Sequence, residues 1–161
     1  MLKKAVIIDL NLNNIKSLTR SLINVGFDCH VGLQDDLIEK SDVLFLPGVG
    51  SFSAAMDYVK KHKIDKKIFK HLSKKKKLIG ICLGMQLLFE QSSEFKITKG
   101  LGILKGKVIS LKKKIKTSNY PVPNIGWNKI ITAKSNLFSN IKKKDFYFVH
   151  SYYVEPKDKK I

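Results

Sequence analysis

Cysteine, arginine and long apolar runs are all scarce in this 161-residue chain, and each scarcity argues against a class of protein. Two cysteines, Cys29 and Cys82, cannot build the disulfide framework of a small secreted domain, so we expect free thiols in a cytoplasmic protein. No apolar run approaches the roughly 18 residues that a membrane span requires. The first run, residues 5–10, is short and contains Asp9, which argues against a signal peptide and against a membrane partner.

The scarcity of arginine changes the meaning of the charge. A net charge of +18 would normally indicate a nucleic-acid partner, but Arg20 is the single arginine and the other thirty basic residues are lysines. Arginine makes forked contacts to phosphate and guanine, whereas lysine is a hydrated point charge. The lysines gather in runs such as 74–77 and 112–114, which we interpret as solvated surface. Nucleic-acid binding stays an alternative, which steeply salt-dependent retention on DNA would favour.

Short apolar runs alternate with helical patterns over the first ninety residues. Residues 6–10, 27–31, 42–46 and 78–81 are typical of strands buried on both faces. The helical positions between them are Ile15, Leu18, Leu22 and Val25, then Phe52, Ala55, Met56 and Val59, and finally Met85, Leu88 and Phe89. Gly26 is expected to end the first helix. This alternation predicts an α/β fold, with a mostly parallel sheet and helices on both faces.

The second half of the chain has a different pattern. Residues 102–104, 108–111, 127–131 and 146–154 are typical of strands, and no helical pattern separates them. No stretch has the composition of a linker. We therefore expect a single domain over residues 1–161, whose second half is rich in β-structure.

The segment Gly80-Ile81-Cys82-Leu83-Gly84 places a cysteine between two glycines, where an expected strand meets an expected helix. A nucleophile is held at such a junction by a sharp, strained turn, and side chains at the flanking positions would collide. The start of the helix also favours the thiolate. A lone cysteine is more commonly a small apolar core residue, but this context favours a catalytic nucleophile.

Residues 47–50, Pro-Gly-Val-Gly, directly follow another expected strand. Two glycines there allow backbone N–H groups to turn toward a ligand, as an acyl-transfer enzyme requires for its oxyanion. The N–H of Leu83, just after the cysteine, is the natural second donor. The alternative is a plain strand-to-helix turn with Ser51 or Ser53 as N-cap.

The same loop excludes two common cofactor motifs. The dinucleotide pattern Gly-x-Gly-x-x-Gly fails because Ser53 stands at its last glycine, and no Gly-x-x-x-x-Gly-Lys phosphate loop occurs. We expect neither a cofactor nor a metal.

Four motifs together resemble one enzyme family. Residues 47–52 (Pro-Gly-Val-Gly-Ser-Phe) and 80–90 (Gly-Ile-Cys-Leu-Gly-Met-Gln-Leu-Leu-Phe-Glu) are similar to those of the class I glutamine amidotransferases. Residues 124–128 (Asn-Ile-Gly-Trp-Asn) and 147–152 (Tyr-Phe-Val-His-Ser-Tyr) resemble motifs of one branch of this family. That branch comprises the glutaminase subunits of imidazole glycerol phosphate synthase, which serve histidine biosynthesis. The resemblance covers nearly the whole chain and implies a flavodoxin-like sheet.

The resemblance implies a role for each matching residue. Cys82 would attack the carboxamide of L-glutamine and form a thioester, with the N–H groups of Val49 and Leu83 as the oxyanion hole. The residues implied in binding glutamine are Gly48, Gly50, Gln86, Glu94, Ser151 and Tyr152. A carboxylate can pair with the α-ammonium group and an amide can bond polar groups, although Gln86 and Glu94 could instead be simply solvated.

The family also implies a partner. Ammonia would pass to a cyclase or synthase barrel subunit in a heterodimer, with Asn14 and Trp127 facing that subunit, although Trp127 and Tyr152 could be ordinary core or interface aromatics. The same subunit type also serves surface-sugar amidotransferases, which stays an alternative. The turn after the first strand departs from the family's usual Gly-x-Gly-Asn, and this leaves the choice of partner open.

One departure concerns the reaction itself. The family's base is a histidine in a His-Pro-Glu segment, and none of His30, His62, His71 and His150 is followed by Pro-Glu. We expect His62 and His71 to be solvated, and His150 to belong to the His-Ser-Tyr motif. Without a base and proton donor, the expected glutaminase activity of these 161 residues is near zero, and we interpret the chain as C-terminally truncated. A non-catalytic scaffold is the corresponding alternative.

Overall fold

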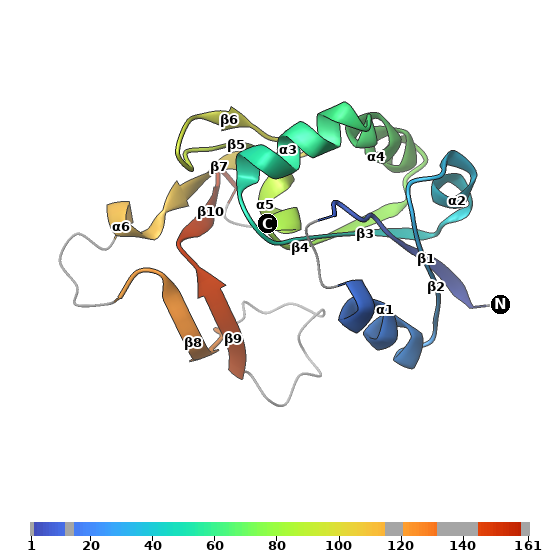
Figure 1. Ribbon diagram of the computed structural model, residues 1–161, viewed down its shortest axis with the longest axis horizontal. Coiled ribbons are helices and arrows are strands. Elements are labelled where there is room, and N and C mark those ends of the chain that lie inside the picture. The colour runs from blue at the N-terminus through green and yellow to red at the C-terminus, as the bar shows by residue number, and fades with distance from the viewer. Residues whose placement is uncertain (1, 12–14, 115–120, 132–144, 159–161) are drawn as a thin grey trace. The chain divides into compact units, whose positions relative to one another are not determined.

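The computed structural model describes residues 2–11, 15–114, 121–131 and 145–158 (Figure 1). The contacts divide the chain into two compact units. The first comprises residues 1–108 and 154–161, and the second comprises residues 109–153.

The first unit contains a parallel sheet of four strands, β1 (Lys3–Ile7), β2 (Phe27–Val31), β3 (Val43–Gly48) and β4 (Lys77–Cys82). Their order is β2-β1-β3-β4, and all neighbours run parallel. This is the strand order of flavodoxin-like sheets as far as it extends, in agreement with the α/β prediction. Ligands on such sheets bind at the carboxyl ends of the strands, where β3 and β4 carry the two glycine-containing motifs.

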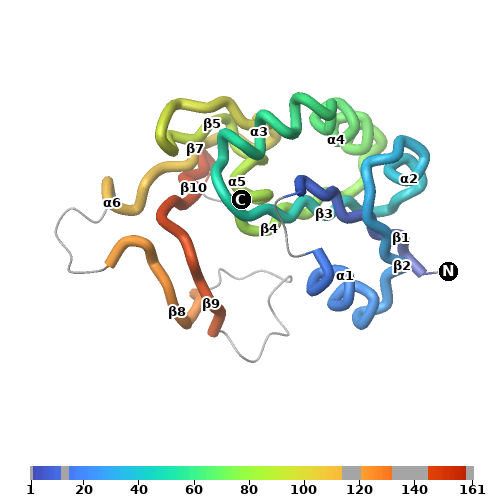
Figure 2. Tube along the Cα trace, viewed as in Figure 1, coloured from blue at the N-terminus to red at the C-terminus, as the bar shows by residue number. Residues whose placement is uncertain are grey.

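Helices cover both faces of this sheet (Figures 1 and 2). One face is covered by α1 (Ile15–Asn24), and the opposite face by α2 (Asp35–Lys40), α3 (Phe52–Lys61), α4 (Ile64–Ser73) and α5 (Leu83–Leu87). Under α1, a cluster of Ala5, Ile7, Leu22, Val43 and Phe45 is buried. Successive residues of a strand point to opposite faces, so Val6, Leu44 and Leu46 are buried on the other side. Each such side chain contributes about 1.5–3 kcal/mol relative to exposure.

The structure corrects three details of the expected elements. The sequence predicts a fully buried β4, but Ile79 and Ile81 are 42% and 37% exposed because β4 is an edge strand of this sheet. The predicted helix after Cys82 is shorter than expected, because Phe89 already belongs to a strand. Val25 lies beyond the end of α1 and is exposed, and Gly26 follows it at φ +88°.

A second sheet has the strand order β10-β7-β5-β6. Its strands are β5 (Phe89–Ser92), β6 (Thr98–Lys99), β7 (Leu104–Ser110) and β10 (Tyr152–Pro156). The two short strands expected at 102–104 and 108–111 thus form one strand, β7. A Cβ at Gly106 would lie 2.4 Å from the carbonyl oxygen of Glu155 in β10, so only glycine allows β7 to lie this close to β10.

The second unit contains a two-stranded antiparallel sheet of β8 (Asn124–Lys129) and β9 (Asp145–His150), together with the single-turn helix α6 (Leu111–Lys114). The strand expected over residues 146–154 is two strands, β9 and β10, which Ser151 separates. The expected β-rich second half is therefore confirmed for the described residues, with one short helix that the pattern did not indicate.

Candidate active site

The backbone of Cys82 is strained at the junction of β4 and α5. Its dihedral angles are φ +55° and ψ −119°, a conformation that L-residues rarely adopt. Such a conformation costs about 1–3 kcal/mol and persists only where the surroundings enforce it. The residue is exposed, as a nucleophile must be, and its thiol is free. The sharp strand-to-helix turn predicted from the sequence is confirmed.

Two close approaches of the backbone explain the glycines on either side of Cys82. A Cβ at Gly84 would lie 1.7 Å from the carbonyl oxygen of Leu46 in β3, and a Cβ at Gly80 would lie 2.6 Å from the Cα of Met85. Both distances are far shorter than any real carbon contact. The glycines therefore allow α5 to start directly against β3, which forces the turn that strains Cys82.

The loop after β3 lies beside this turn. Gly48 is the register partner of Cys82, and a Cβ at Gly48 would lie 3.0 Å from the Cβ of Leu83. Gly50 has φ +98° and no heavy atom within 4 Å of its Cβ position, so the backbone angle alone requires glycine there. The N–H of Leu83 belongs to the first turn of α5 and has no acceptor inside the helix. The two segments expected to form an oxyanion hole are thus adjacent.

Ser51 caps helix α3, which starts directly after this loop. Its side chain accepts a hydrogen bond from the N–H of Ala54 at 3.4 Å, and its backbone is extended, as an N-cap requires. The N-cap that the sequence offered as an alternative to an oxyanion loop is therefore present, directly after the left-handed φ of Gly50.

Glu94 makes a contact that the sequence did not indicate. Its Oε2 accepts a hydrogen bond from the backbone N–H of Phe52, the first residue of α3, at 2.6 Å. The two residues are separated by 42 positions, and no local pattern reports such a pairing. Gln86 is half-buried on α5, one turn beyond the nucleophile. Glu94 and Gln86 are thus in the first unit with Cys82.

The other expected site residues lie elsewhere in the chain. Ser151, Tyr152 and Trp127 belong to the second unit, and Asn14 lies outside the described residues. The carbonyl oxygen of Ser151 accepts from the N–H of Leu111 at 2.9 Å. Trp127 is 73% exposed and stacks edge-on against Tyr147 at 5.7 Å between ring centroids, so the alternative of an ordinary core aromatic is wrong for Trp127.

The two motifs that narrowed the resemblance meet in the second unit. Asn124 is the register partner of His150, and the Asn124 amide nitrogen lies 3.0 Å from Nε2 of His150. Nδ1 of the same ring lies 2.9 Å from the carbonyl oxygen of Tyr152. A carbonyl only accepts, so Nδ1 donates and Nε2 accepts from the amide. Both ring nitrogens of His150 therefore have partners, as expected for a residue that orders its motif.

The expectation that His71 is solvated is wrong. Its side chain is 3% exposed on the inner face of α4, and Nε2 donates to the carbonyl oxygen of Lys77 at 3.0 Å. Burial lowers the pKa of His71, and the nearby Lys76 lowers it further. His62 is exposed, as expected, and packs against the ring of Tyr58. Both histidines have lysines as sequence neighbours, so the sequence pattern does not show that His71 is buried and His62 exposed.

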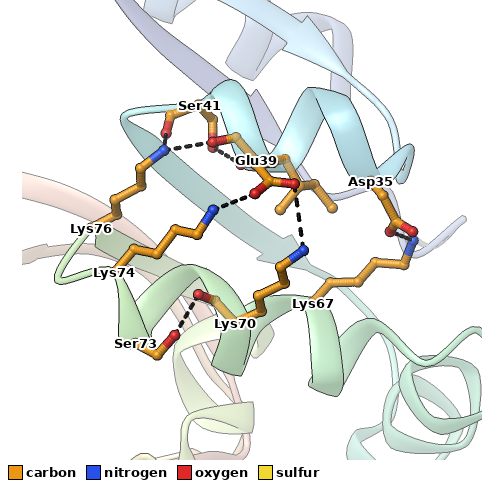
Figure 3. A network of polar contacts seen from close by, with 9 residues as sticks. Asp35, Glu39, Ser41, Lys67, Lys70, Ser73, Lys74 and Lys76 are labelled. Carbon is orange, nitrogen blue, oxygen red and sulfur yellow. Dashed lines mark hydrogen bonds and ion pairs between the residues drawn. The ribbon is translucent and has the colours of Figure 1, made fainter.

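Three lysines of the lysine-rich stretch are paired with acidic residues (Figure 3). Lys67 binds Asp35, and Lys70 and Lys74 both bind Glu39, so that α4 is tied to α2. These pairs line a cavity of about 370 Å³ between the two helices, which also includes His62 and His71 but not Cys82. The cations lower the pKa values of Asp35 and Glu39. Exposed pairs of this kind contribute little stability each.

No group of three or more histidine, cysteine, aspartate or glutamate residues in the described parts of the chain is arranged to hold a metal ion. None of the described helices has the length and apolar character needed to cross a membrane.

Comparison with known proteins places this geometry in context. The family "Glutamine amidotransferase class-I" matches residues 6–161. The chain is 42% identical to "Imidazole glycerol phosphate synthase subunit HisH" of Bacillus velezensis, over 92% of this chain and 71% of that protein. It is also 42% identical to the HisH subunit of Aquifex aeolicus, over 98% of this chain and 75% of that protein.

Solved structures agree on the fold. PurLQS from Thermotoga maritima is similar with a TM-score of 0.62 at 19% identity, over 99% of this chain and 72% of that chain. A crystal structure of a glutamine amidotransferase gives a TM-score of 0.58 at 16% identity, over 78% of this chain and 62% of that chain.

Proposed function

Because the chain belongs to the class I glutamine amidotransferase family, we propose that it is the glutaminase subunit of an imidazole glycerol phosphate synthase in histidine biosynthesis. The single observation that carries the chemistry is the strained, exposed Cys82 at the strand-to-helix turn. The name of these relatives supports the pathway, and no feature of the described residues favours the surface-sugar alternative over it.

The proposed reaction follows from this geometry. Cys82 gives up its thiol proton and attacks the carboxamide carbon of glutamine as the thiolate, and the C–N bond breaks as the nitrogen takes up that proton and leaves as ammonia. Water then hydrolyses the thioester to glutamate and returns the thiol. The N–H groups of Val49 and Leu83 stabilise the oxyanion of each step, and one such donor is worth roughly 3 kcal/mol. Thiols stay reduced in the cytoplasm, so the free thiols support a cytoplasmic location.

Substrate recognition is the next part of the proposal. We propose that Glu94 pairs with the α-ammonium group of glutamine and that Gln86 bonds its polar groups, with Gly48 and Gly50 shaping the loop beside the carboxamide. Ser151 and Tyr152 are proposed to contribute backbone contacts.

An exposed apolar face supports the proposed partner. Ile125, Trp127, Tyr147 and Val149 are paired across β8 and β9 and are all exposed. Apolar side chains clustered on one face are typical of a protein interface. We propose that this face, together with Asn14, contacts the barrel subunit that receives the ammonia. Trp127→Ala is expected to weaken binding of that subunit at least tenfold in a titration, as for a central aromatic anchor.

The experiment that tests the function is covalent labelling. A diazoketone analogue of glutamine should alkylate Cys82 with saturable kinetics, and free glutamine should protect it. Cys82→Ser should abolish labelling, whereas Cys29→Ser should not change it. Labelling that does not saturate, or that glutamine does not prevent, would contradict the proposal.

Turnover is a separate question. The 161 residues contain no His-Pro-Glu, so we propose that this polypeptide releases glutamate from glutamine at a rate near background, even with the barrel subunit present. Removing the general base of a nucleophile commonly lowers kcat by several orders of magnitude. Robust glutamate release would contradict this expectation and would identify a base among the residues present.

A further inference from the structure

Glu94 connects two parts of the proposed active site. Its Oε2 accepts from the N–H of Phe52, so the carboxylate holds the start of α3, directly after the loop of residues 47–50. Ser51 caps a different donor, the N–H of Ala54, so the two residues satisfy separate groups of the first turn. The loop that carries Val49 is therefore fixed at its far end by a residue that is distant in sequence.

Glu94 itself is firmly held. Its own N–H donates to the hydroxyl of the buried Ser92 at 3.1 Å, and its carbonyl oxygen accepts from the N–H of Lys96 at 2.5 Å. The preceding N–H, of Ser93, donates to the carbonyl oxygen of Val108 in β7 at 3.0 Å. The carboxylate thus extends from the segment that follows β5 to the start of α3. In the described parts of the chain, the contact recorded for its side chain uses Oε2, which leaves Oε1 for a ligand.

We infer that Glu94 is a positioning residue, which holds the oxyanion loop through α3 with one oxygen while the other binds the α-ammonium group of glutamine. This inference rests on the proposed function and deepens it. A carboxylate shared in this way connects recognition of the amino-acid end to the placement of the N–H of Val49. Small displacements of such a donor reduce transition-state stabilisation strongly.

Two probes separate positioning from simple ammonium binding. One is the diazoketone analogue of glutamine, and the other is the same diazoketone without its amino group. Both need a polarised ketone carbonyl to react with Cys82, but only the first carries the ammonium group. Iodoacetamide, whose displacement reaction depends far less on the oxyanion loop, reports the intrinsic reactivity of the thiol.

The two substitutions of Glu94 should then behave differently. Glu94→Gln keeps an oxygen that accepts from Phe52 but loses the charge, so only the amino probe should slow, by about tenfold. Glu94→Ala removes both functions, so the desamino probe should also slow by about tenfold relative to iodoacetamide. A desamino probe that reacts equally fast with Glu94→Ala and the wild type would overturn the inference.

The Phe52 amide proton supplies a measurement on the wild-type chain, independent of whether Glu94→Ala folds. Its NMR shift should report the hydrogen bond to the Glu94 carboxylate, and Glu94→Gln should move it upfield, because a neutral amide oxygen is a weaker acceptor than a carboxylate. A Phe52 shift that Glu94→Gln leaves unchanged would overturn the inference. Failure of the amino probe to label wild-type Cys82 would instead count against the proposed function, because the Phe52 signal tests the contact separately.

Discussion

The two edge strands of the parallel sheet each carry one of the two cysteines, and their settings differ. Cys29 lies within β2, half-buried against the cluster under α1, and burial with the nearby Asp28 raises its thiol pKa. Cys82 ends β4, is exposed, and has a left-handed φ. The same side chain is a packing residue at one edge and a candidate nucleophile at the other. The difference comes from the backbone, because only β4 ends in a glycine-flanked turn.

The largest expected effect is on the turn itself. Gly84→Ala places a methyl group against the carbonyl oxygen of Leu46 and should lower the free energy of unfolding by about 3 kcal/mol, as measured by urea denaturation. Gly26→Ala is the control, because its Cβ meets no heavy atom within 4 Å and only its φ of +88° is strained, at about 1 kcal/mol. Equal losses in the two variants would show that the approach to β3 is unimportant.

The reaction rates of the two thiols test directly whether Cys29 and Cys82 differ in setting. Cys82 should react with iodoacetamide at pH 7 about tenfold faster than Cys29, because Cys29 is half-buried and its raised pKa leaves less thiolate. Mass spectrometry of Cys29→Ser and Cys82→Ser, each with one remaining thiol, measures the two rates separately. Similar rates would contradict the assignment of Cys29 as a packing residue.

His71 tests the start of β4, since its ring bonds the carbonyl oxygen of Lys77. The folded chain lowers its pKa, so the unfolded chain binds the proton more readily. Stability should therefore fall as the pH drops below about 6.5, by at most about 1.4 kcal/mol per pH unit. His71→Gln should remove this part of the pH dependence of the urea midpoint, whereas the exposed His62→Gln should retain it.

The smallest expected effect is on Glu90, which lies in β5 and so belongs to neither edge strand of the parallel sheet. The N–H of Gly106, at 2.9 Å from Oε2, and then Lys157 and Lys105 lower the pKa of Glu90 to about 2. The stabilisation of the folded chain by the ionised Glu90 carboxylate is thus complete above about pH 4.5 and is lost as the pH falls from there toward 2. Glu90→Gln should reduce the fall in the free energy of unfolding between pH 4.5 and 2, as measured by urea denaturation, and Glu155→Gln serves as the control. A slope that Glu90→Gln leaves unchanged would assign acid unfolding to other groups.

The local elements were largely predictable from the sequence. The buried face of α3 follows from apolar residues at helical spacing, and the turn at Cys82 follows from its two glycines, because both signals lie within ten residues. The exposure of Ile79 and Ile81 was not predictable, since an apolar run does not state how many neighbours its strand has. The burial of His71 was hidden for a similar reason, because a lysine-rich helix still has one inner face.

The amino-acid sequence by itself determined the family, the candidate nucleophile and the glycine-containing loop beside it, because glycine requirements and apolar periodicity are local properties of the chain. Only the tertiary structure decided which residues hold these segments in place. The Glu94–Phe52 hydrogen bond and the pairing of Asn124 with His150 join segments 42 and 26 residues apart. Such contacts form when strands and helices pack, and no local sequence pattern encodes them.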